Sequence, residues 1–217
     1  MGDRVTKGAS EKQPVRGKLF VIAAPSGAGK TSLVRALMHR MPELKFSISY
    51  TTRKQRETEV HTHDYFFVDK PTFEGMIAAG AFLEYAQVFD NYYGTSRQQV
   101  QDLLDAGQNV LLEIDWQGAQ QIRKAAPEVE SIFILPPSRA ELERRLRDRK
   151  TDSEEVIARR LRDSIDDMSH WSEFDYVVVN QDFERAVDDL QNIVTGHGAH
   201  LRRTRAELQT LVDQLLG

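Results

Sequence analysis

The sequence contains no cysteine, which excludes disulfide bonds and thiolate zinc sites and is typical of a reducing compartment. It also has no apolar run near the ~18 residues that a membrane-spanning helix requires. The first seventeen residues are polar and lack the apolar centre of a signal peptide. We therefore expect a cytoplasmic protein without a membrane partner, whose residues 1–17 form a disordered tail.

The charges are nearly balanced, with 29 basic and 33 acidic side chains and a formal net charge of −4. This balance lacks the basic excess that binds nucleic acids or acidic membrane surfaces, so we expect neither partner. A chain of 217 residues is long enough to bury a sizeable core in one or two domains. The composition leaves a homo-oligomer open.

The stretch that organises the chain is residues 18–31, KLFVIAAPSGAGKT. The apolar run Leu19–Ala24 predicts a buried strand, and a helical pattern begins at Lys30. Between them, Gly27 and Gly29 let the backbone turn tightly and approach a ligand closely. A strand, a glycine-rich turn and a helix in this order predict a loop whose N–H groups point at a phosphate.

The exit of this loop carries the side chains that phosphate chemistry requires. Lys30 would reach the β- and γ-phosphates of a nucleotide, and the hydroxyl of Thr31 would hold Mg²⁺. The usual pattern has a glycine where this chain has Ala24, and an ordinary glycine-rich turn is the alternative interpretation. That alternative does not explain the Lys-Thr pair at the exit of the turn.

Apolar strands without polar alternation, separated by helical patterns, predict a parallel sheet that is covered on both faces. The stretch from about 45 to 95 differs, because its predicted strands are short, alternating and close together. We expect it to form an antiparallel insertion with a separate binding surface. Within it, residues 45–50 predict one strand and residues 91–94, NYYG, predict a turn. The candidate core strands are residues 19–24, 109–115, 131–135 and 176–180.

The insertion contains four side chains that suit a second phosphate, carried by an acceptor molecule. An arginine binds phosphate through two parallel hydrogen bonds, and a tyrosine hydroxyl can donate to it. A solvated charged loop is the alternative interpretation for the arginines. The four side chains are those of Arg53, Arg56, Tyr65 and Tyr93.

Three arginines, Arg145, Arg149 and Arg160, flank a break between two predicted helices at residues 150–153. A helix–loop–helix lid would bring them onto a phosphoryl group in transfer and exclude water. An exposed pair of helices with mixed charge is the alternative.

Glu113 and Asp115 stand at the carboxyl end of a predicted buried strand, where open α/β sheets place their ligands. Buried carboxylates need a cation or a donor, which Mg²⁺ with phosphates or the N–H groups of a purine would supply. Helix-capping or salt-bridged acids are the alternative. Two histidine pairs lack a third metal ligand at useful spacing and are interpreted as surface residues: His61 with His63, and His197 with His200.

Seven segments combine these features with a definite order and spacing: APSGAGKTS at 24–32, SISYTTR at 47–53, EVHTHDYFFV at 59–68, FLEYAQVFDNYYGTS at 82–96, LEIDWQGAQQI at 112–122, IFILPPS at 132–138 and VVVN at 177–180. Together they resemble the guanylate kinase family of nucleoside monophosphate kinases. The resemblance covers nearly the whole chain, from Lys18 to about Leu216.

The resemblance implies an α/β fold with a P-loop parallel sheet core, helices on both faces, an antiparallel GMP-binding insertion and a helical lid. It implies an ATP:GMP phosphotransferase of purine nucleotide metabolism, which converts MgATP and GMP into ADP and GDP. The implied guanylate kinase domain spans residues 18–217, with its core at 18–46, 96–137 and 170–217, its insertion at 47–95 and its lid at 138–169.

By match to the family's pattern, the site residues fall into four groups. ATP would be bound by Ala24, Pro25, Ser26, Gly27, Ala28, Gly29, Lys30, Thr31 and Ser32. Catalysis would rest on Lys30, Arg53, Arg145, Arg149 and Arg160. GMP would be bound by Ser49, Arg53, Arg56, Glu59, Tyr65, Glu84, Tyr93, Gly94, Thr95 and Asp115, with Ser49, Glu84 and Thr95 at the guanine end. Mg²⁺ would be held by Thr31, with Asp115 binding through a water molecule.

The chain departs from the family's pattern at four positions. Gln55 replaces a proline and Thr58 a glycine, so the loop that carries Arg53 is expected to be less rigid. Lys150 replaces a glycine in the lid, and Glu113 stands where aspartate is common. Two other functions stay open: a phosphopeptide-binding module, which has no use for the Lys-Thr pair, and a phosphate-loop kinase for another acceptor.

Overall fold

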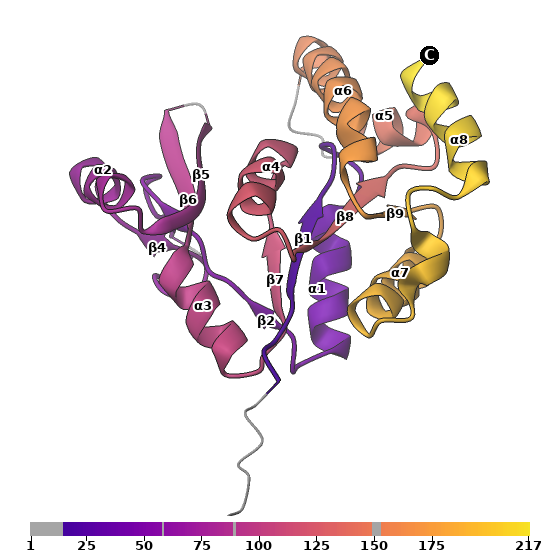
Figure 1. Cartoon of the computed structure of the whole chain (residues 1–217). Coiled ribbons are helices and arrows are strands. Elements are labelled where there is room, and N and C mark those ends of the chain that lie inside the picture. Colours follow the sequence, from indigo (N-terminus) through magenta and orange to yellow (C-terminus); the bar gives the residue numbers. More distant parts are fainter. Residues whose placement is uncertain (1–14, 58, 89, 149–152) are drawn as a thin grey trace, which may run out of the picture.

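The computed structural model describes residues 15–57, 59–88, 90–148 and 153–217 (Figure 1). Most of the expected tail, residues 1–14, therefore lies outside the described residues. Residues 15–17, the end of the expected tail, are described, and two of them contact the rest of the protein. The N–H of Gly17 donates to the carbonyl of Leu104 at 2.8 Å, and the guanidinium of Arg16 pairs with Asp105.

The core is a five-stranded sheet in which all neighbouring strands run parallel, as predicted from the apolar runs. Its order is β2-β7-β1-β8-β9, so β1 lies at the centre and is buried at all five positions. Parallel sheets need cover on both faces, which is why these strands lack polar alternation. The strands are β1 (Leu19–Ala23), β2 (Lys45–Phe46), β7 (Val110–Glu113), β8 (Glu130–Leu135) and β9 (Tyr176–Val179).

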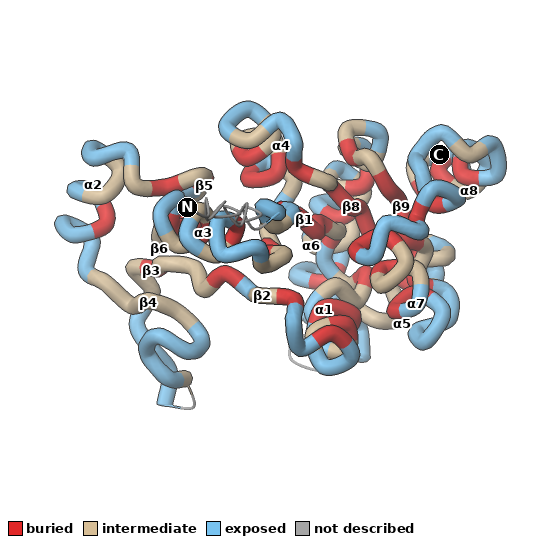
Figure 2. The backbone as a smooth tube through the Cα atoms, turned by 60° about the horizontal axis from the view of Figure 1, so that its bottom comes forward, coloured by how far each residue is buried: buried red, intermediate tan, exposed pale blue. Residues whose placement is uncertain are grey.

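Two hydrophobic clusters cover the two faces of this sheet, and Figure 2 shows the buried strands between exposed helix surfaces. One face packs against α1 (Lys30–Arg40), α7 (Phe183–Val194) and the 3₁₀ helix η2 (Gly198–Leu201). The other packs against α3 (Arg97–Asp105), α4 (Trp116–Ala125), α5 (Arg139–Arg147), α6 (Glu154–Ser169) and α8 (Ala206–Leu216). A second 3₁₀ helix, η1 (His170–Glu173), follows α6 directly. Within the described ranges, no helix is long and apolar enough to cross a membrane.

The stretch between β2 and α3 forms a second sheet of order β4-β3-β6-β5, which stands beside the core together with α2 (Lys70–Ala78) (Figure 1). The prediction that this sheet is antiparallel is wrong at one pair. Strand β6 runs antiparallel to β3 and β5, but β3 and β4 are parallel. Because β3 and β4 are parallel, the chain between them must return to the end of the sheet at which β3 begins. The strands are β3 (Tyr50–Thr51), β4 (Phe66–Phe67), β5 (Phe82–Val88) and β6 (Asn91–Ser96).

Two local predictions in this stretch are corrected. The predicted strand over residues 45–50 is two strands in different sheets, because the chain leaves the core sheet after β2 and joins the second sheet at β3. The predicted turn over residues 91–94 is part of β6. An aromatic side chain of this strand packs against the neighbouring helix: Tyr92 stacks on Phe73 of α2, with 5.3 Å between the ring centres. Such side-chain packing favours a strand.

Helix α4 connects the two sheets. The side-chain amide of Gln121 accepts from the N–H of Tyr85 at 3.2 Å and donates to the carbonyl of the same residue at 3.0 Å. This pair holds β5 against the core. The carboxyl end of β7 faces the second sheet across a cleft.

Candidate active site

A cleft of ≈ 680 Å³ lies between the core and the second sheet, a volume that suits a small-molecule ligand. Eight residues that were predicted to form the site line it together: Lys30, Thr31, Ser49, Glu59, Tyr65, Glu84, Tyr93 and Asp115. Its other lining residues are Val34, Arg35, Met38, Phe46, Asp64, Ala86, Glu113 and Ile114. The cleft thus joins the exit of the phosphate loop to the side chains of the inserted sheet.

The conformation of the phosphate loop requires glycine at two positions. Gly27 and Gly29 have φ angles of 88° and 93°, in the left-handed region that other residues rarely adopt. Space is also lacking. A Cβ at Gly27 would lie 2.9 Å from Leu142 of α5, and one at Gly29 would lie 2.5 Å from the amide nitrogen of Asn180. The loop is therefore enclosed by α5 and by the residue that follows β9.

Lys30 and Thr31, the first two residues of α1, are both bound to the end of β7. The ammonium of Lys30 donates to the carbonyl of Ile114 at 2.7 Å. Burial lowers the pKa of Lys30, and the carboxylates of Glu113, Asp115 and Asp167 oppose that shift. Lys30 is thus a half-buried ammonium group among acids, held at the carboxyl end of β7.

The hydroxyl of Thr31 donates to the carboxylate of Glu113 at 2.6 Å. Asp115, the acid that was expected near the metal, accepts instead from the N–H of Gly118 at 2.7 Å and caps α4. Hard cations such as Mg²⁺ bind hydroxyl and carboxylate oxygens together with phosphates and water. The described residues contain no cluster of three or more metal-binding side chains, so phosphate oxygens would have to complete such a site. Thr31 with Glu113 is the pair that fits it.

Arg53 is held in place by Glu59. Its two terminal nitrogens donate to the two carboxylate oxygens at 3.0 and 2.7 Å, and its guanidinium lies 5.4 Å from the centre of the Tyr65 ring. The hydrogen bonds from Arg53 lower the pKa of Glu59. The same carboxylate accepts from the backbone N–H of Arg56 at 2.9 Å, while the Arg56 side chain is exposed. Glu59 therefore orders the loop that presents both arginines beside Tyr65 and Tyr93.

Glu84 on β5 is the buried acid of the cleft, with 6% of its surface exposed. The hydroxyl of Thr95, itself buried on β6, donates to Glu84 at 2.6 Å. Burial raises the pKa of Glu84 to about 7, the Thr95 bond opposes this, and the carboxylate of Asp115 adds to it. A Cβ on Gly118 would lie 3.1 Å from Asp115 and 3.2 Å from Glu84, so the glycine lets the two acids approach one another across α4.

Some predicted residues do not line the cleft. Gly94 faces the rings of Phe73 and Phe82, each 3.0 Å from where its Cβ would be, so it serves packing in the second sheet. Thr95 does not line the cleft either, but its hydroxyl donates to Glu84, which does. Arg53, Arg56 and the loop residues from Ala24 to Gly29, with Ser32, also lie outside the set that lines the cleft.

The three lid arginines have different places. Arg145 on α5 donates to the carbonyls of Ala28 and Asn180 at 3.3 and 3.0 Å, directly over the phosphate loop. Arg160 lies half-buried on α6. Arg149 falls outside the described residues, as do Thr58 and Lys150.

Sequence reasoning missed Asn180 as a residue of the loop. Its buried side-chain amide donates to the carbonyl of Ala28 at 2.7 Å. The signal was its place directly after an apolar strand, at the edge where open sheets bind ligands.

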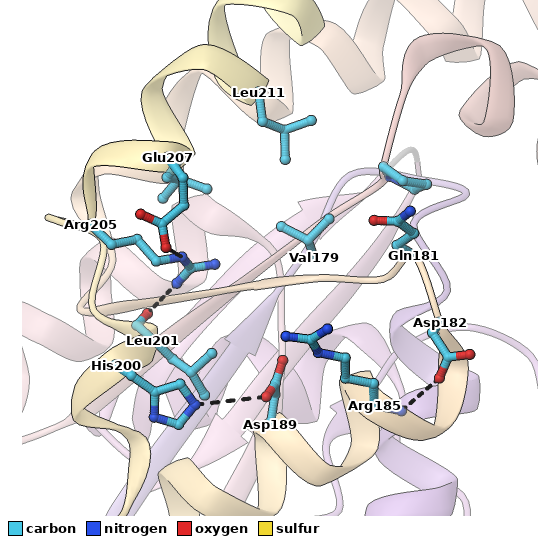
Figure 3. Close-up of a pocket in the computed structure, with 12 residues that line it drawn as sticks. Val179, Gln181, Asp182, Arg185, Asp189, His200, Leu201, Arg205, Glu207 and Leu211 are labelled. Atoms are coloured by element: carbon cyan, nitrogen blue, oxygen red, sulfur yellow. Dashed lines mark hydrogen bonds and ion pairs between the residues drawn. The ribbon is translucent and has the colours of Figure 1, made fainter.

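A second cavity, of ≈ 620 Å³, lies at the far edge of the core between β9, α7 and α8 (Figure 3). It contains none of the predicted site residues. His200, one of the histidines interpreted as surface residues, lies there with its Nε2 4.0 Å from the carboxylate of Asp189. The other pair is on the inserted sheet, where the Nδ1 of His61 accepts from the N–H of Phe67 at 3.1 Å.

Comparison with known proteins gives one answer. The family model for guanylate kinase matches residues 16–197. The chain is 53% identical over 203 residues to guanylate kinase of Chromohalobacter salexigens, covering 94% of each chain. It is 54% identical over 202 residues to that of Methylococcus capsulatus, covering 93% of this chain and 99% of the relative. Among solved structures, guanylate kinase from Anaplasma phagocytophilum matches with a TM-score of 0.69 and 32% identity, over 92% of this chain and 95% of that one. On these matches, over a fold of the class the sequence predicted, the chain belongs to the guanylate kinase family.

Proposed function

We propose that this protein transfers the γ-phosphoryl group of ATP to GMP, giving ADP and GDP. The observation that carries the proposal is the single cleft that contains Lys30 and Thr31 at one end and Tyr65, Tyr93 and Glu84 at the other. A phosphate loop alone would bind a nucleotide, whereas this cleft also has a place for an acceptor.

Phosphoryl transfer depends on placing donor and acceptor in line and on neutralising charge. The backbone N–H groups of the phosphate loop and the ammonium of Lys30 would bind the ATP phosphates. Arg145, which lies over Ala28, and Arg160 on α6 would stabilise charge on the group in transfer. In this assignment α5 and α6 act as the lid.

The acceptor phosphate would be bound by Arg53, with Arg56 and the hydroxyls of Tyr65 and Tyr93 beside it. The bidentate bond to Glu59 fixes the plane of the Arg53 guanidinium, and Nη1 also donates to the carbonyl of Lys54. The Nε–H and the second N–H of Nη2 would then donate to the phosphate. The second sheet is therefore assigned as the GMP-binding part.

The guanine base would be read by Glu84 and Ser49. Guanine presents its N1–H and its N2 amino group side by side, which suits one carboxylate, and the Ser49 hydroxyl would donate to O6. Adenine has an acceptor at N1 and lacks this pair of donors. The buried position of Glu84 makes an unsatisfied carboxylate costly, which favours the base that satisfies it.

Thr31 and Glu113 would hold Mg²⁺ together with the ATP phosphates. The hydroxyl and the carboxylate already lie 2.6 Å apart, and both are oxygen ligands of the kind Mg²⁺ prefers. The metal would supply charge neutralisation and a fixed geometry for the phosphates.

A coupled assay of ADP release tests the proposal. With MgATP, we expect turnover with GMP and little with AMP or dTMP. ADP release that does not depend on GMP, or that depends on another monophosphate, would overturn it. Binding of a phosphopeptide without any turnover would support the binding-module alternative.

A further inference from the structure

One face of α6 is bound to two segments that adjoin the nucleotide end of the cleft, the phosphate loop and the start of α4. The buried hydroxyl of Ser164 donates to the backbone carbonyl of Ser26, in the phosphate loop, at 3.0 Å. Three residues further along α6, Asp167 accepts the indole N–H of Trp116 at 3.1 Å. Trp116 is the first residue of α4 and directly follows Asp115, which lines the cleft.

The contact at Trp116 is reinforced by its surroundings. The indole stacks on His170, with the ring centres 3.4 Å apart and the planes at 12°. The Nδ1 of His170 lies 2.6 Å from the carboxylate of Glu173, which also accepts from the side-chain amide of Gln120 at 2.7 Å. The end of α6 and the two end residues of η1 are thus bound to the first turns of α4.

Arg160 lies on the same face of α6 as these two contacts. Residues 160, 164 and 167 are spaced by four and by three, which places them in one row along a helix. Ser164 is one turn away from Arg160. A rotation of α6 that breaks the Ser164 contact would therefore also shift Arg160 relative to the phosphate loop, and a misplacement of about 1 Å at a catalytic group can cost ~10²-fold in rate.

We propose that Ser164 and the Trp116–Asp167 pair are positioning residues for phosphoryl transfer. They touch no substrate. They fix the rotation of α6 over the phosphate loop, and so aim Arg160 at the group in transfer. This inference rests on the proposed function, and within it assigns a role to three side chains that are not among the predicted site residues.

Double-mutant cycles test the inference. Ser164→Ala and Trp116→Phe are each made alone and together with Arg160→Ala, and kcat and KM are measured for ATP and GMP. Ser164→Ala removes one hydrogen bond and leaves a good helix former, and Trp116→Phe keeps an aromatic ring but removes the N–H. Each single variant should lower kcat about three- to tenfold, the effect of one hydrogen bond, with KM for GMP changed by less than about twofold.

The decisive comparison is made without Arg160. If the two contacts act by aiming that arginine, neither Ser164→Ala nor Trp116→Phe should lower kcat further in the Arg160→Ala protein. If the losses in kcat of the single variants multiply in the double variants, the proposal is overturned, because the contacts would then act on the fold or on another group. Single variants with the kcat of the wild type would overturn it too.

Two matched controls lie on the same elements. Ser169→Ala removes a hydroxyl that donates to the carbonyl of Asp166 within α6 itself. Trp171→Phe removes the indole N–H of the neighbouring tryptophan, which has no hydrogen bond in the part of the chain that the structure describes. Both should keep the kcat of the wild type, and a tenfold loss in either would count against the proposal.

Melting temperatures separate positioning from unfolding. If Trp116→Phe melts below the assay temperature, Ser164→Ala, the milder change, decides alone. A wild-type protein without GMP-dependent ADP release would instead refute the proposed function, which is a different result from an active wild type whose cycles show no coupling.

Discussion

Burial of Glu84 has opposite consequences for the stability of the fold and for the recognition of guanine, because the charge that would bind the base is costly to bury. The carboxyl is 6% exposed, and its pKa is raised from an ordinary 4.5 to about 7. Above pH 7 it carries a charge that has only Thr95 as a hydrogen-bond donor among the described residues. The proposed site uses that charge to accept two N–H groups of GMP. Glu84→Gln therefore tests both roles at once.

The effect on stability has a definite sign. The folded-state pKa lies above the unfolded value, so the contribution of the neutral carboxyl is fully present below about pH 4.5 and is lost as the pH rises through about 7. At ~1.4 kcal/mol per pKa unit, the loss by pH 8 is on the order of 3 kcal/mol. Glu84→Gln, which never charges, should melt several degrees above the wild type at pH 8 and close to it at pH 4.5.

Glu84→Gln, which should raise stability at pH 8, should lower activity toward GMP. IMP keeps N1–H and O6 but lacks the amino group, so the wild type should prefer GMP to IMP by roughly 10–100-fold in kcat/KM. Glu84→Gln accepts through one oxygen only and should lower turnover of GMP and reduce this ratio. In the wild type, kcat/KM for GMP should fall as the pH drops below about 7, because Glu84 then carries a proton.

Calorimetry at the two pH values and kcat/KM for both nucleotides in both proteins decide the matter. A melting difference that is the same at pH 4.5 and pH 8 would refute the assigned burial cost. An unchanged GMP/IMP ratio would show that the base is read elsewhere, with Asp115 the next acid in the cleft.

Three further outcomes follow from the site. Lys30→Met should cut kcat by at least ~10³-fold at an unchanged melting temperature, and near-normal turnover would refute the assignment of this loop to ATP. Arg53→Ala should weaken the binding of GMP by about 1.5–3 kcal/mol and leave the binding of ATP unchanged, and Glu59→Gln should weaken the binding of GMP by less. An equal rise in KM for both nucleotides would contradict the acceptor site. Glu113→Gln and Thr31→Ala should each raise the Mg²⁺ concentration required for half-maximal rate, and an unchanged Mg²⁺ titration would remove both from the metal site.

The core could be predicted because its signal is local. Each buried strand is a short apolar run followed by a helical pattern, and a parallel sheet is the arrangement that buries both faces of such strands. The insertion was harder to predict, because its strands depend on partners distant in sequence. Nothing within residues 45–50 indicates that β2 and β3 belong to different sheets, and the aromatic residues of 91–94 become a strand through their contacts with α2 and β5.

The same distinction separates the site residues that a motif reveals from those that it cannot. Gly29 attracted notice as a residue that permits an unusual backbone conformation, and its φ of 93° agrees with that. Its second requirement, space for the amide of Asn180, links two residues that are 151 positions apart, and no pattern near either one contains it. Ser164 likewise acts on Ser26 across 138 positions of sequence. A phosphate loop can be found from its own residues, but the side chains that hold it in place can be found only from the fold.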